Sequence, residues 1–321
     1  MTTRWAGIDE AGYGPNLGPL VMTAVVAEGP DDGREPDLWG DLPSTVTRAG
    51  GASDKAWVDD SKKVYQAGKG RDRLDATTLA ALAATGRGVP KTLGGLLEGL
   101  GAGTLDEVEL SPWLDQGDPK YPALRSRTMA EWTVARRPFE GAPWRIIDVR
   151  SVVVGPRRFN EGLAATGSKA LVHFAAFARL LAHLRATTPT GQRVAIRGDK
   201  HGGRNFYGDL LAGAFPDAQV VRGPEGPELS RYEMVGPGEE QLALELVPRA
   251  DSGDGLVALA SIVSKAVREH WMDAFNAHWT ARIPGLRPTA GYPVDAARFR
   301  LAIEADALAR GLDPESWWRA K

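Results

Sequence analysis

The chain lacks cysteine altogether, because none of its 321 residues is of that type. This absence excludes disulfide bonds, thiolate metal ligands and cysteine nucleophiles at once. A chain without disulfides suits a reducing compartment, so we expect a cytoplasmic protein.

Net charge and long apolar runs are also scarce. The formal net charge is −2, so any surface that binds nucleic acid must be a local basic patch. The longest apolar runs, such as LVMTAVVA from Leu20, fall far short of the roughly 20 residues that span a bilayer. Carboxylates appear within the first ten residues, before the apolar core of a signal peptide can form. We therefore expect a soluble protein with no membrane contact.

Strand-like and helical patterns alternate along the rest of the chain. Short runs rich in β-branched residues predict strands at 4–9, 20–27, 144–154, 193–198, 231–235 and 241–247. Apolar residues three and four apart predict helices at 71–84, 169–185, 255–279 and 295–310. This alternation predicts an α/β fold in which helices cover a sheet.

One domain accounts for the whole chain, 1–321, since no internal repeat or low-complexity tract divides it. Residues 86–143 mix Gly-rich pieces, short helical patterns and two tryptophans, and we expect them to form an inserted accessory lobe. Residues 280–321 are expected to form a helical C-terminal extension.

Acidic residues follow three of the predicted strands. Asp9 and Glu10 follow the first strand, Asp199 follows RVAIRG, and Asp251 follows QLALELVPRA. Functional groups in open α/β sheets gather just beyond strand ends, so these acids are candidates to meet in space. Hard cations such as Mg²⁺ prefer oxygen ligands, and two such ions can hydrolyse a phosphodiester. The ordinary alternatives stay open here: Asp199 as a turn residue and Asp251 as the N-cap of the next helix.

The Asp9–Glu10 pair poses a geometric problem. Neighbours on a regular strand point to opposite faces of the sheet. We expect the pleat to end at Ala11–Gly12, so that the longer Glu10 side chain turns back toward Asp9.

Four blocks of sequence resemble the type 2 ribonucleases H (ribonuclease HII). They are AGIDEAGYGPNLGPLV from Ala6, the DSKK of 60–63, ALASIVSKAVRE of 258–269 following Asp251, and AGYP of 290–293. The blocks occur in the order in which the family has them. Such an ordered set is far more specific than any one block.

The resemblance implies a ribonuclease H-like fold, with a mixed five-stranded sheet flanked by helices, plus insertions. It implies hydrolysis of the RNA strand of RNA/DNA hybrids, or of ribonucleotide-containing DNA, in replication or repair. Two Mg²⁺ or Mn²⁺ ions would be held by Asp9, Glu10, Asp199 and Asp251. The positions implied to contact nucleic acid are Gly12, Tyr13, Gly14, Lys62, Lys63, Ser261, Lys265 and Tyr292.

The chain departs from the family at several positions. Tyr13 stands where the family has the arginine of G-R-G, the tripeptide that reads the ribose 2′-hydroxyl. Lys200 follows Asp199 where the family usually has Gly-Asn, and the spacing to Asp251 is longer. These departures define a divergent member.

Further residues have both a functional and an ordinary interpretation. Arg197, Lys200 and Arg204 flank Asp199 and either cradle a phosphate or belong to a solvated loop. The aromatic and basic C-terminus from Trp317 resembles a strand-binding tail, but docking onto the core is the expected role.

Four functions compete at this point. The leading one is an endonuclease for RNA in hybrids, and the second is a nuclease of the same fold with another substrate, such as branched DNA. The third is a non-catalytic nucleic-acid-binding module, which the retention of four clustered acids disfavours. The fourth, a small-phosphate hydrolase, lacks the motif elements it would need.

Overall fold

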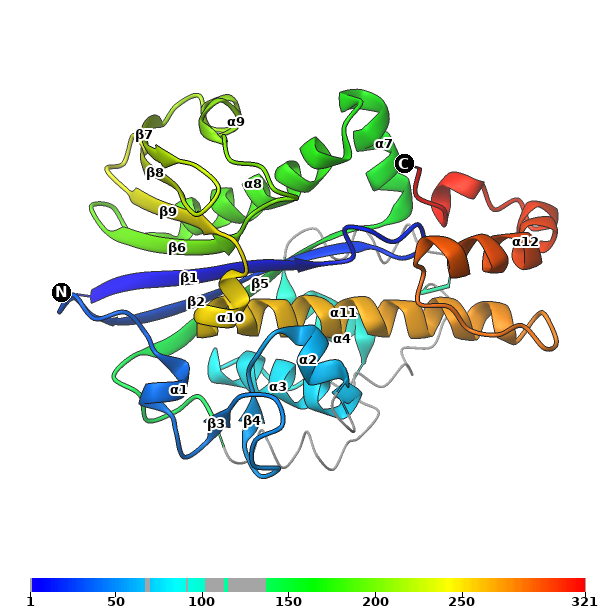
Figure 1. Cartoon of the computed structure of the whole chain (residues 1–321), viewed down its shortest axis with the longest axis horizontal. Helices are drawn as coiled ribbons and strands as arrows, with labels where there is room; N and C mark the ends of the chain where they lie inside the picture. Colours follow the sequence, from blue (N-terminus) through cyan, green and yellow to red (C-terminus); the bar gives the residue numbers. More distant parts are fainter. Residues whose placement is uncertain (1, 67–69, 91, 102–112, 115–136, 321) are drawn as a thin grey trace.

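A mixed sheet forms the centre of the protein (Figure 1). The computed structural model describes residues 2–66, 70–90, 92–101, 113–114 and 137–320. Its main sheet has the order β5-β2-β1-β6-β9-β8-β7. The strands are β1 (Thr2–Ala11), β2 (Leu20–Pro30), β5 (Arg145–Val154), β6 (Arg193–Asp199), β7 (Gln219–Glu225), β8 (Ser230–Val235) and β9 (Gln241–Val247). The neighbours β1, β6 and β9 run parallel, and every other adjacent pair is antiparallel.

Helices cover both faces of this sheet, as Figure 1 shows. On one face lie α1 (Leu38–Asp41), α2 (Ser61–Gln66), α3 (Gly70–Ala84), α4 (Leu93–Leu100), α10 (Ala250–Gly253) and α11 (Gly255–Thr280). On the other lie α7 (Pro156–Thr166), α8 (Lys169–Thr187) and α9 (Gly208–Ala214). The chain ends with α12 (Pro293–Ala309) and the 3₁₀ turn η1 (Pro314–Ser316), and β3 (Val46–Thr47) pairs in parallel with β4 (Ala56–Trp57).

The two faces enclose separate apolar cores because side chains of a strand alternate in direction. On β1, Trp5 faces the core under α11, whereas Ala6 and Ile8 face the core under α8. The long helix α11 approaches β1 closely, since a Cβ on Gly7 would lie 2.2 Å from the backbone of Leu256. Only glycine permits this contact, which places the start of α11 directly over β1.

The β1–β2 hairpin follows from its sequence. Ten residue pairs, from Thr2 opposite Pro30 to Ala11 opposite Val21, hold the strands together. At Gly12 the chain turns with a φ of 90°, and a Cβ there would lie 2.3 Å from the carbonyl oxygen of Pro19. Gly12 therefore fixes where the strand ends and the loop begins.

The predicted α/β fold is confirmed, and the sheet has seven strands where five were expected. The two additional strands, β8 and β7, extend the sheet beyond β9. The sequence predicted β8 but not β7, whose residues are mostly exposed and include Arg222, Gly223 and Pro224. A charged edge strand of this kind lacks the apolar alternation on which strand prediction rests.

The proposed lobe at 86–143 is described only in part, because 91, 102–112 and 115–136 lie outside the described residues. Within the described part, the leucines of α4 join the core under α11. Trp113 packs against Trp271 and Phe275 at the far end of α11. The described pieces of this segment therefore pack against the main body.

The C-terminal segment docks onto the body as the sequence predicted. Trp317 and Arg319 are fully buried, and Trp318 forms a β-bridge with Leu17. In the described ranges, no helix is both long enough and apolar enough to cross a bilayer.

Candidate active site at the edge of the parallel strands

Three of the four predicted acids lie where the parallel strands β1, β6 and β9 end. Ile8 pairs with Gly198, so Asp9 and Asp199 are the next residues on two adjacent strands. Asp199 pairs with Val247 of β9, and Asp251 follows in α10. Carboxyl ends of parallel strands meet at one edge, and the prediction that these acids converge rests on this geometry.

Asp9 is the most enclosed of these acids, with 8% of its surface exposed. Its carboxylate accepts hydrogen bonds from the Ser261 hydroxyl and from the backbone N–H of Glu10. Burial, and then the charge of Glu10, raise the pKa of Asp9 well above its usual range. Ser264 of α11 donates to the carbonyl oxygen of Asp9 at 3.0 Å, which ties this end of β1 to the helix.

Asp199 is held by backbone donors. Its Oδ1 accepts from the N–H of Lys200 at 2.8 Å and from the N–H of Arg249 at 2.7 Å. Burial nevertheless raises the pKa of Asp199, and the charge of Glu10 adds to the effect. Asp199 is therefore oriented by the residue that follows it and by the residue that precedes α10, and the second of these contacts comes from a distant segment of the chain.

Asp251 is half-buried, and burial with the charges of Asp60 and Asp199 raises its pKa to about 6. It does not cap the following helix. That role belongs to Asp254, whose Oδ1 accepts from the N–H groups of Leu256 and Val257 at 2.8 and 3.0 Å. The N-cap alternative for Asp251 was therefore wrong.

Asp60 is a fifth acid at this edge that the sequence-based site prediction missed. It lies immediately before α2, in the DSKK block, and its charge acts on Asp251. The DSKK block could have indicated Asp60, but only its two lysines were predicted to belong to the site.

Glu10 lies on the opposite face of the sheet from Asp9. The strand β1 keeps its pairing with β2 through Ala11, so the pleat does not end early enough to redirect this side chain. Its Oε2 lies 3.4 Å from Nε2 of His173 on α8, while Asp9 faces Ser261 of α11. The strand end expected at Ala11–Gly12 is confirmed, but the Glu10 side chain is directed toward His173 and does not turn back toward Asp9. Its charge still raises the pKa values of Asp9 and Asp199.

The donor set at this edge fits a hard divalent cation by its chemistry. Within the described ranges, no three carboxylate or imidazole side chains converge as they stand to hold an ion. The acids still act on one another, because Glu10 and Asp251 raise the pKa of Asp9, and Asp199 raises that of Asp251. A divalent cation bound between these carboxylates would offset their mutual repulsion.

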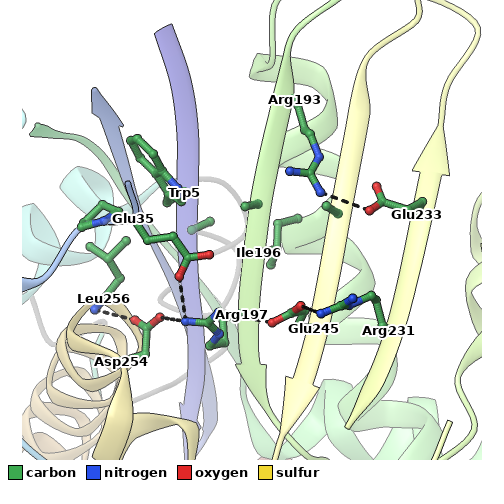
Figure 2. Close-up of a pocket in the computed structure, with 14 residues that line it drawn as sticks. Trp5, Glu35, Arg193, Ile196, Arg197, Arg231, Glu233, Glu245, Asp254 and Leu256 are labelled. Atoms are coloured by element: carbon green, nitrogen blue, oxygen red, sulfur yellow. Dashed lines mark hydrogen bonds and ion pairs between the residues drawn. The ribbon is translucent and has the colours of Figure 1, made fainter. Parts of the chain in front are cut away.

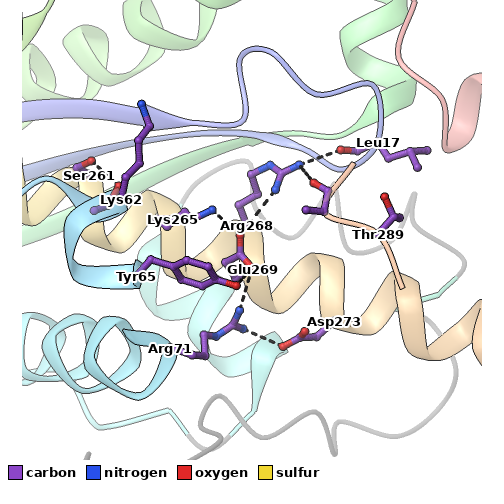
Figure 3. A network of polar contacts seen from close by, with 12 residues as sticks. Leu17, Lys62, Tyr65, Arg71, Ser261, Lys265, Arg268, Glu269, Asp273 and Thr289 are labelled. Atoms are coloured by element: carbon purple, nitrogen blue, oxygen red, sulfur yellow. Dashed lines mark hydrogen bonds and ion pairs between the residues drawn. The ribbon is translucent and has the colours of Figure 1, made fainter. Parts of the chain in front are cut away.

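The three lysines predicted to bind nucleic acid differ in their surroundings, and Figure 3 shows Lys62 and Lys265. Lys63 pairs with Asp59 at 3.1 Å, and Lys265 pairs with Glu269 at 2.6 Å. Lys62 is exposed, and no ion pair forms at its ammonium group among the described residues. It is therefore the lysine of the three most readily available to a phosphate.

Ser261 is 3% exposed, and its hydroxyl is hydrogen-bonded to that of Ser61 at 3.0 Å as well as to Asp9. Ser261 therefore orients the carboxylate of Asp9. It is too deeply buried to make the predicted direct contact with nucleic acid.

Two of the basic residues around Asp199 have structural partners. Arg197 lines a cavity of about 220 Å³ on the α11 face of the sheet and contacts Glu35, Glu245 and Asp254 at 3.1–3.2 Å (Figure 2). Lys200 Nζ donates to the carbonyl of Gly226 at 2.6 Å. Both side chains point into the fold, so neither is positioned to cradle a phosphate.

Tyr13 stands beside Glu10 in an aromatic cluster. Its ring meets the ring of His173 edge-on at 4.8 Å, and Lys169 Nζ lies 4.9 Å from its centroid. Beside Tyr13 is an open cavity of about 450 Å³, which is also lined by His201, Arg204 and Phe206. Phe206 is 67% exposed, an unusual position for so large an apolar side chain.

Arg268, a fully buried residue of α11, joins the first and fourth sequence blocks. Its Nη2 donates to the carbonyls of Leu17 and Ala290, both at 3.0 Å (Figure 3). Tyr292, two residues after Ala290, is 50% exposed. The two loops that the resemblance assigns to substrate are thus held together by one guanidinium group.

Comparison with known proteins gives matches among solved structures alone. No family model and no curated protein matches the sequence. Ribonuclease HII of Archaeoglobus fulgidus, solved in complex with PCNA, is similar over 99% of this chain and 94% of its own, at 15% identity and a TM-score of 0.43. Ribonuclease H2 of Pyrococcus horikoshii is similar over 98% of this chain and 92% of its own, at 15% identity and a TM-score of 0.41.

A third solved structure, Bst-RNase HIII in complex with Mn²⁺, is similar over 99% of this chain and 66% of its own, at 16% identity and a TM-score of 0.39. These three solved structures are thus a ribonuclease HII, a ribonuclease H2 and a ribonuclease HIII.

Proposed function

We propose that this protein is a metal-dependent endonuclease that hydrolyses the RNA strand of RNA/DNA hybrids. The observation that carries the proposal is the group of acids at the edge of β1, β6 and β9. Burial and neighbouring carboxylates raise the pKa values of Asp9, Asp199 and Asp251, as is common for acids at functional sites.

Mg²⁺ or Mn²⁺ would be held by Asp9, Glu10, Asp199 and Asp251, with two ions as the expected number. The ions would supply an activated water and offset the charge on the leaving oxygen. Asp9 and Asp199 are fixed by Ser261 and by backbone N–H groups, so their oxygens need little reorganisation.

The surface around the acids suits a nucleic-acid strand. Lys62 offers a charge to a phosphate, while Tyr13, Phe206 and Tyr292 offer partly exposed rings to sugars or bases. The backbone of Gly12 and Gly14 follows Glu10 closely in the chain and would be available to a ribose next to the scissile phosphate. Together these groups favour a ribonucleotide-containing duplex.

A second substrate class stays under consideration because of one observation. Tyr13 takes the place of the arginine expected in the 2′-hydroxyl-reading tripeptide, and its ring is engaged with His173. A nuclease of this fold for another substrate, such as branched DNA, is consistent with that change. A non-catalytic module is disfavoured, since clustered acids that raise one another's pKa destabilise a fold that does not use them.

The test is cleavage of labelled duplexes that carry a full hybrid, a single embedded ribonucleotide or DNA alone, with Mg²⁺ or Mn²⁺. We expect the wild type to cut the ribonucleotide-containing duplexes. Asp9→Asn, which keeps shape and removes one ligand charge, should abolish cleavage while the protein stays folded. Asp31→Asn, at an exposed position beyond β2, is the control and should leave cleavage unchanged. Wild-type turnover by Asp9→Asn would falsify the assignment.

A further inference from the structure

The C-terminal segment lies directly against the loop that follows Glu10. Its backbone runs beside the loop: the N–H of Arg319 donates to the carbonyl of Asn16 at 2.8 Å, and Asn16 Nδ2 donates to the carbonyl of Arg319 at 3.1 Å. The neighbouring residues Trp318 and Leu17 form a β-bridge. The segment is therefore an added strand-like border of the β1–β2 loop.

The side chain of Arg319 reaches further into this loop. It is 1% exposed, and its guanidinium lies 3.9 Å from the ring centroid of Phe159. Nη1 donates to the carbonyl of Gly12 at 2.5 Å, and Nη2 donates to the carbonyl of Tyr13 at 3.1 Å. Burial, and then the charge of Arg268, lower the pKa of Arg319 to about 9, so the group is still charged at neutral pH. Both hydrogen bonds are charge-assisted.

Holding these two carbonyls also aims two amide groups. A peptide unit is planar and trans, so its N–H points opposite to its C=O. Fixing the carbonyl of Gly12 turns the N–H of Tyr13 to the opposite side, and fixing the carbonyl of Tyr13 does the same to the N–H of Gly14. In the described part of the chain, neither N–H group donates a hydrogen bond. Two donors are thus left facing away from Arg319, in the loop beside Glu10.

The segment that carries Arg319 is anchored from a site away from the loop. Asn160 of α7 donates through Nδ2 to the carbonyls of Glu315 and Trp318, at 3.2 and 2.8 Å. Its Oδ1 accepts from the N–H of Ala320 at 2.8 Å. One buried amide side chain therefore fixes both sides of Arg319 without touching the loop.

We propose that Arg319 is a positioning residue of the substrate site: it holds the carbonyls of Gly12 and Tyr13 so that the N–H groups of Tyr13 and Gly14 face the 2′-hydroxyl of a ribonucleotide. The proposal rests on the proposed function for its substrate. The C-terminal segment and the backbone of the loop would together discriminate between ribose and deoxyribose. The side chain at position 13 cannot supply the guanidinium group of the family's arginine, because this residue is a tyrosine.

Three variants test this role. Arg319→Met keeps an unbranched stem over Phe159 and removes both donors. Asn160→Leu releases the segment at its remote anchor. Arg300→Met is the matched control, because Arg300 lies 4.9 Å from the ring centroid of Trp318 and contacts the same segment without reaching the loop.

Affinity for a hybrid and for the same DNA duplex is measured with a chelator present, so that no strand is cut. We expect the preference for the hybrid to fall about tenfold in Arg319→Met and in Asn160→Leu, the equivalent of one hydrogen bond. Arg300→Met should keep the wild-type preference. A purely structural role would lower both affinities alike, and an unchanged ratio in Arg319→Met overturns the proposal.

Amide hydrogen exchange supplies a readout that does not depend on substrate. The N–H groups of Asn16 and Leu17 donate to the carbonyl of Gly291 at 2.9 and 3.3 Å, so they report whether the loop is held. Exchange there should accelerate in Arg319→Met while the centre of β1 keeps its protection. Equal acceleration throughout β1 means global destabilisation and rejects the role. If the wild type itself shows no hybrid preference, the substrate is wrong, and exchange alone decides whether Arg319 holds the loop.

Discussion

Nε2 of His173 lies 3.4 Å from Oε2 of Glu10, so a buried imidazole on α8 faces the acid that points away from Asp9. The same imidazole ring packs edge-on against Tyr13 at 4.8 Å and against His201 at 4.4 Å. One side chain therefore touches both a proposed metal ligand and the proposed substrate loop. Its substitution should affect metal use before it affects the fold.

Replacing His173 by Phe keeps the ring packing and removes the nitrogen beside Glu10. The Mg²⁺ concentration for half-maximal cleavage should rise roughly 10–100-fold, as is typical when a partner of a metal ligand is lost. His183→Phe is the control on the same helix, since His183 contacts Asp148 far from the site. The measurement is a metal titration of cleavage rate, and an unchanged midpoint in His173→Phe removes His173 from the site.

Asp251 gives the metal-free protein a pH-dependent stability. Burial, and then the charges of Asp60 and Asp199, raise its pKa to about 6, above its value in the unfolded chain. The folded state then binds the proton more tightly, so stability falls as pH rises from about 4 to 6. In Asp251→Asn, the free energy of unfolding should fall by about 2 kcal/mol less over this pH range than in the wild type. This value takes account of the screening of a half-exposed carboxylate by solvent. Chemical unfolding across this pH range without metal checks it, and added Mg²⁺ should flatten the wild-type profile.

An acid with the opposite shift provides the control for this experiment. Burial opposes ionisation of Asp148, but the hydrogen bond from His183 and the charge of Arg87 outweigh it and lower the pKa of Asp148. Asp148→Asn should therefore lose stability above about pH 4, where Asp251→Asn gains it. The same sign in both variants would contradict the electrostatic account of the site.

Salt dependence of binding separates the three lysines. Lys62 is exposed without an ion pair in the described ranges, whereas Lys63 and Lys265 already pair with Asp59 and Glu269. Lys62→Ala should lower the slope of log affinity against log salt by about 1. Lys265→Ala should change it less, because the phosphate contact would have to break an existing pair. Binding titrations at several salt concentrations decide, and equal slopes for wild type and Lys62→Ala would remove the predicted contact.

We expect Tyr13 to set the preference between substrates. Its ring can stack on a sugar or base, so we expect wild type to cut continuous hybrids at least as well as a lone ribonucleotide in DNA. Tyr13→Arg should favour the lone ribonucleotide by roughly 1.5–3 kcal/mol, the range for a charge-assisted hydrogen bond. Tyr13→Phe keeps the edge contact with His173 and is the control. Cleavage rates on both duplexes test this, and strong wild-type activity on the lone ribonucleotide counts against it.

Local patterns in the sequence were sufficient for most of the fold. The strands β1 and β2 follow from short β-branched runs, and the helices α8 and α11 follow from apolar residues three and four apart, which each segment carries by itself. The edge of the parallel strands followed from the order of these elements. β7 was missed because its exposed, charged residues carry no such pattern.

Side-chain direction and pairing were less accessible to sequence analysis. Arg197 and Lys200 flank Asp199 in the chain, yet their partners Glu35, Asp254 and Gly226 come from distant segments that fold back. The direction of Glu10 depended on whether β1 continues to Ala11, which its pairing with β2 decides. Long-range partners of this kind are set by tertiary structure, and local spacing does not reveal them.

The contact between Arg319 and Gly12 joins residues 307 positions apart. A newly made chain can therefore fold its hairpin long before this part of the loop is secured. Arg319 is synthesised 307 residues after Gly12, so the contact cannot form until the ribosome has added all the residues between them. Until then the loop that follows Glu10 lacks its C-terminal border, so substrate discrimination would mature later than the sheet that carries the acids.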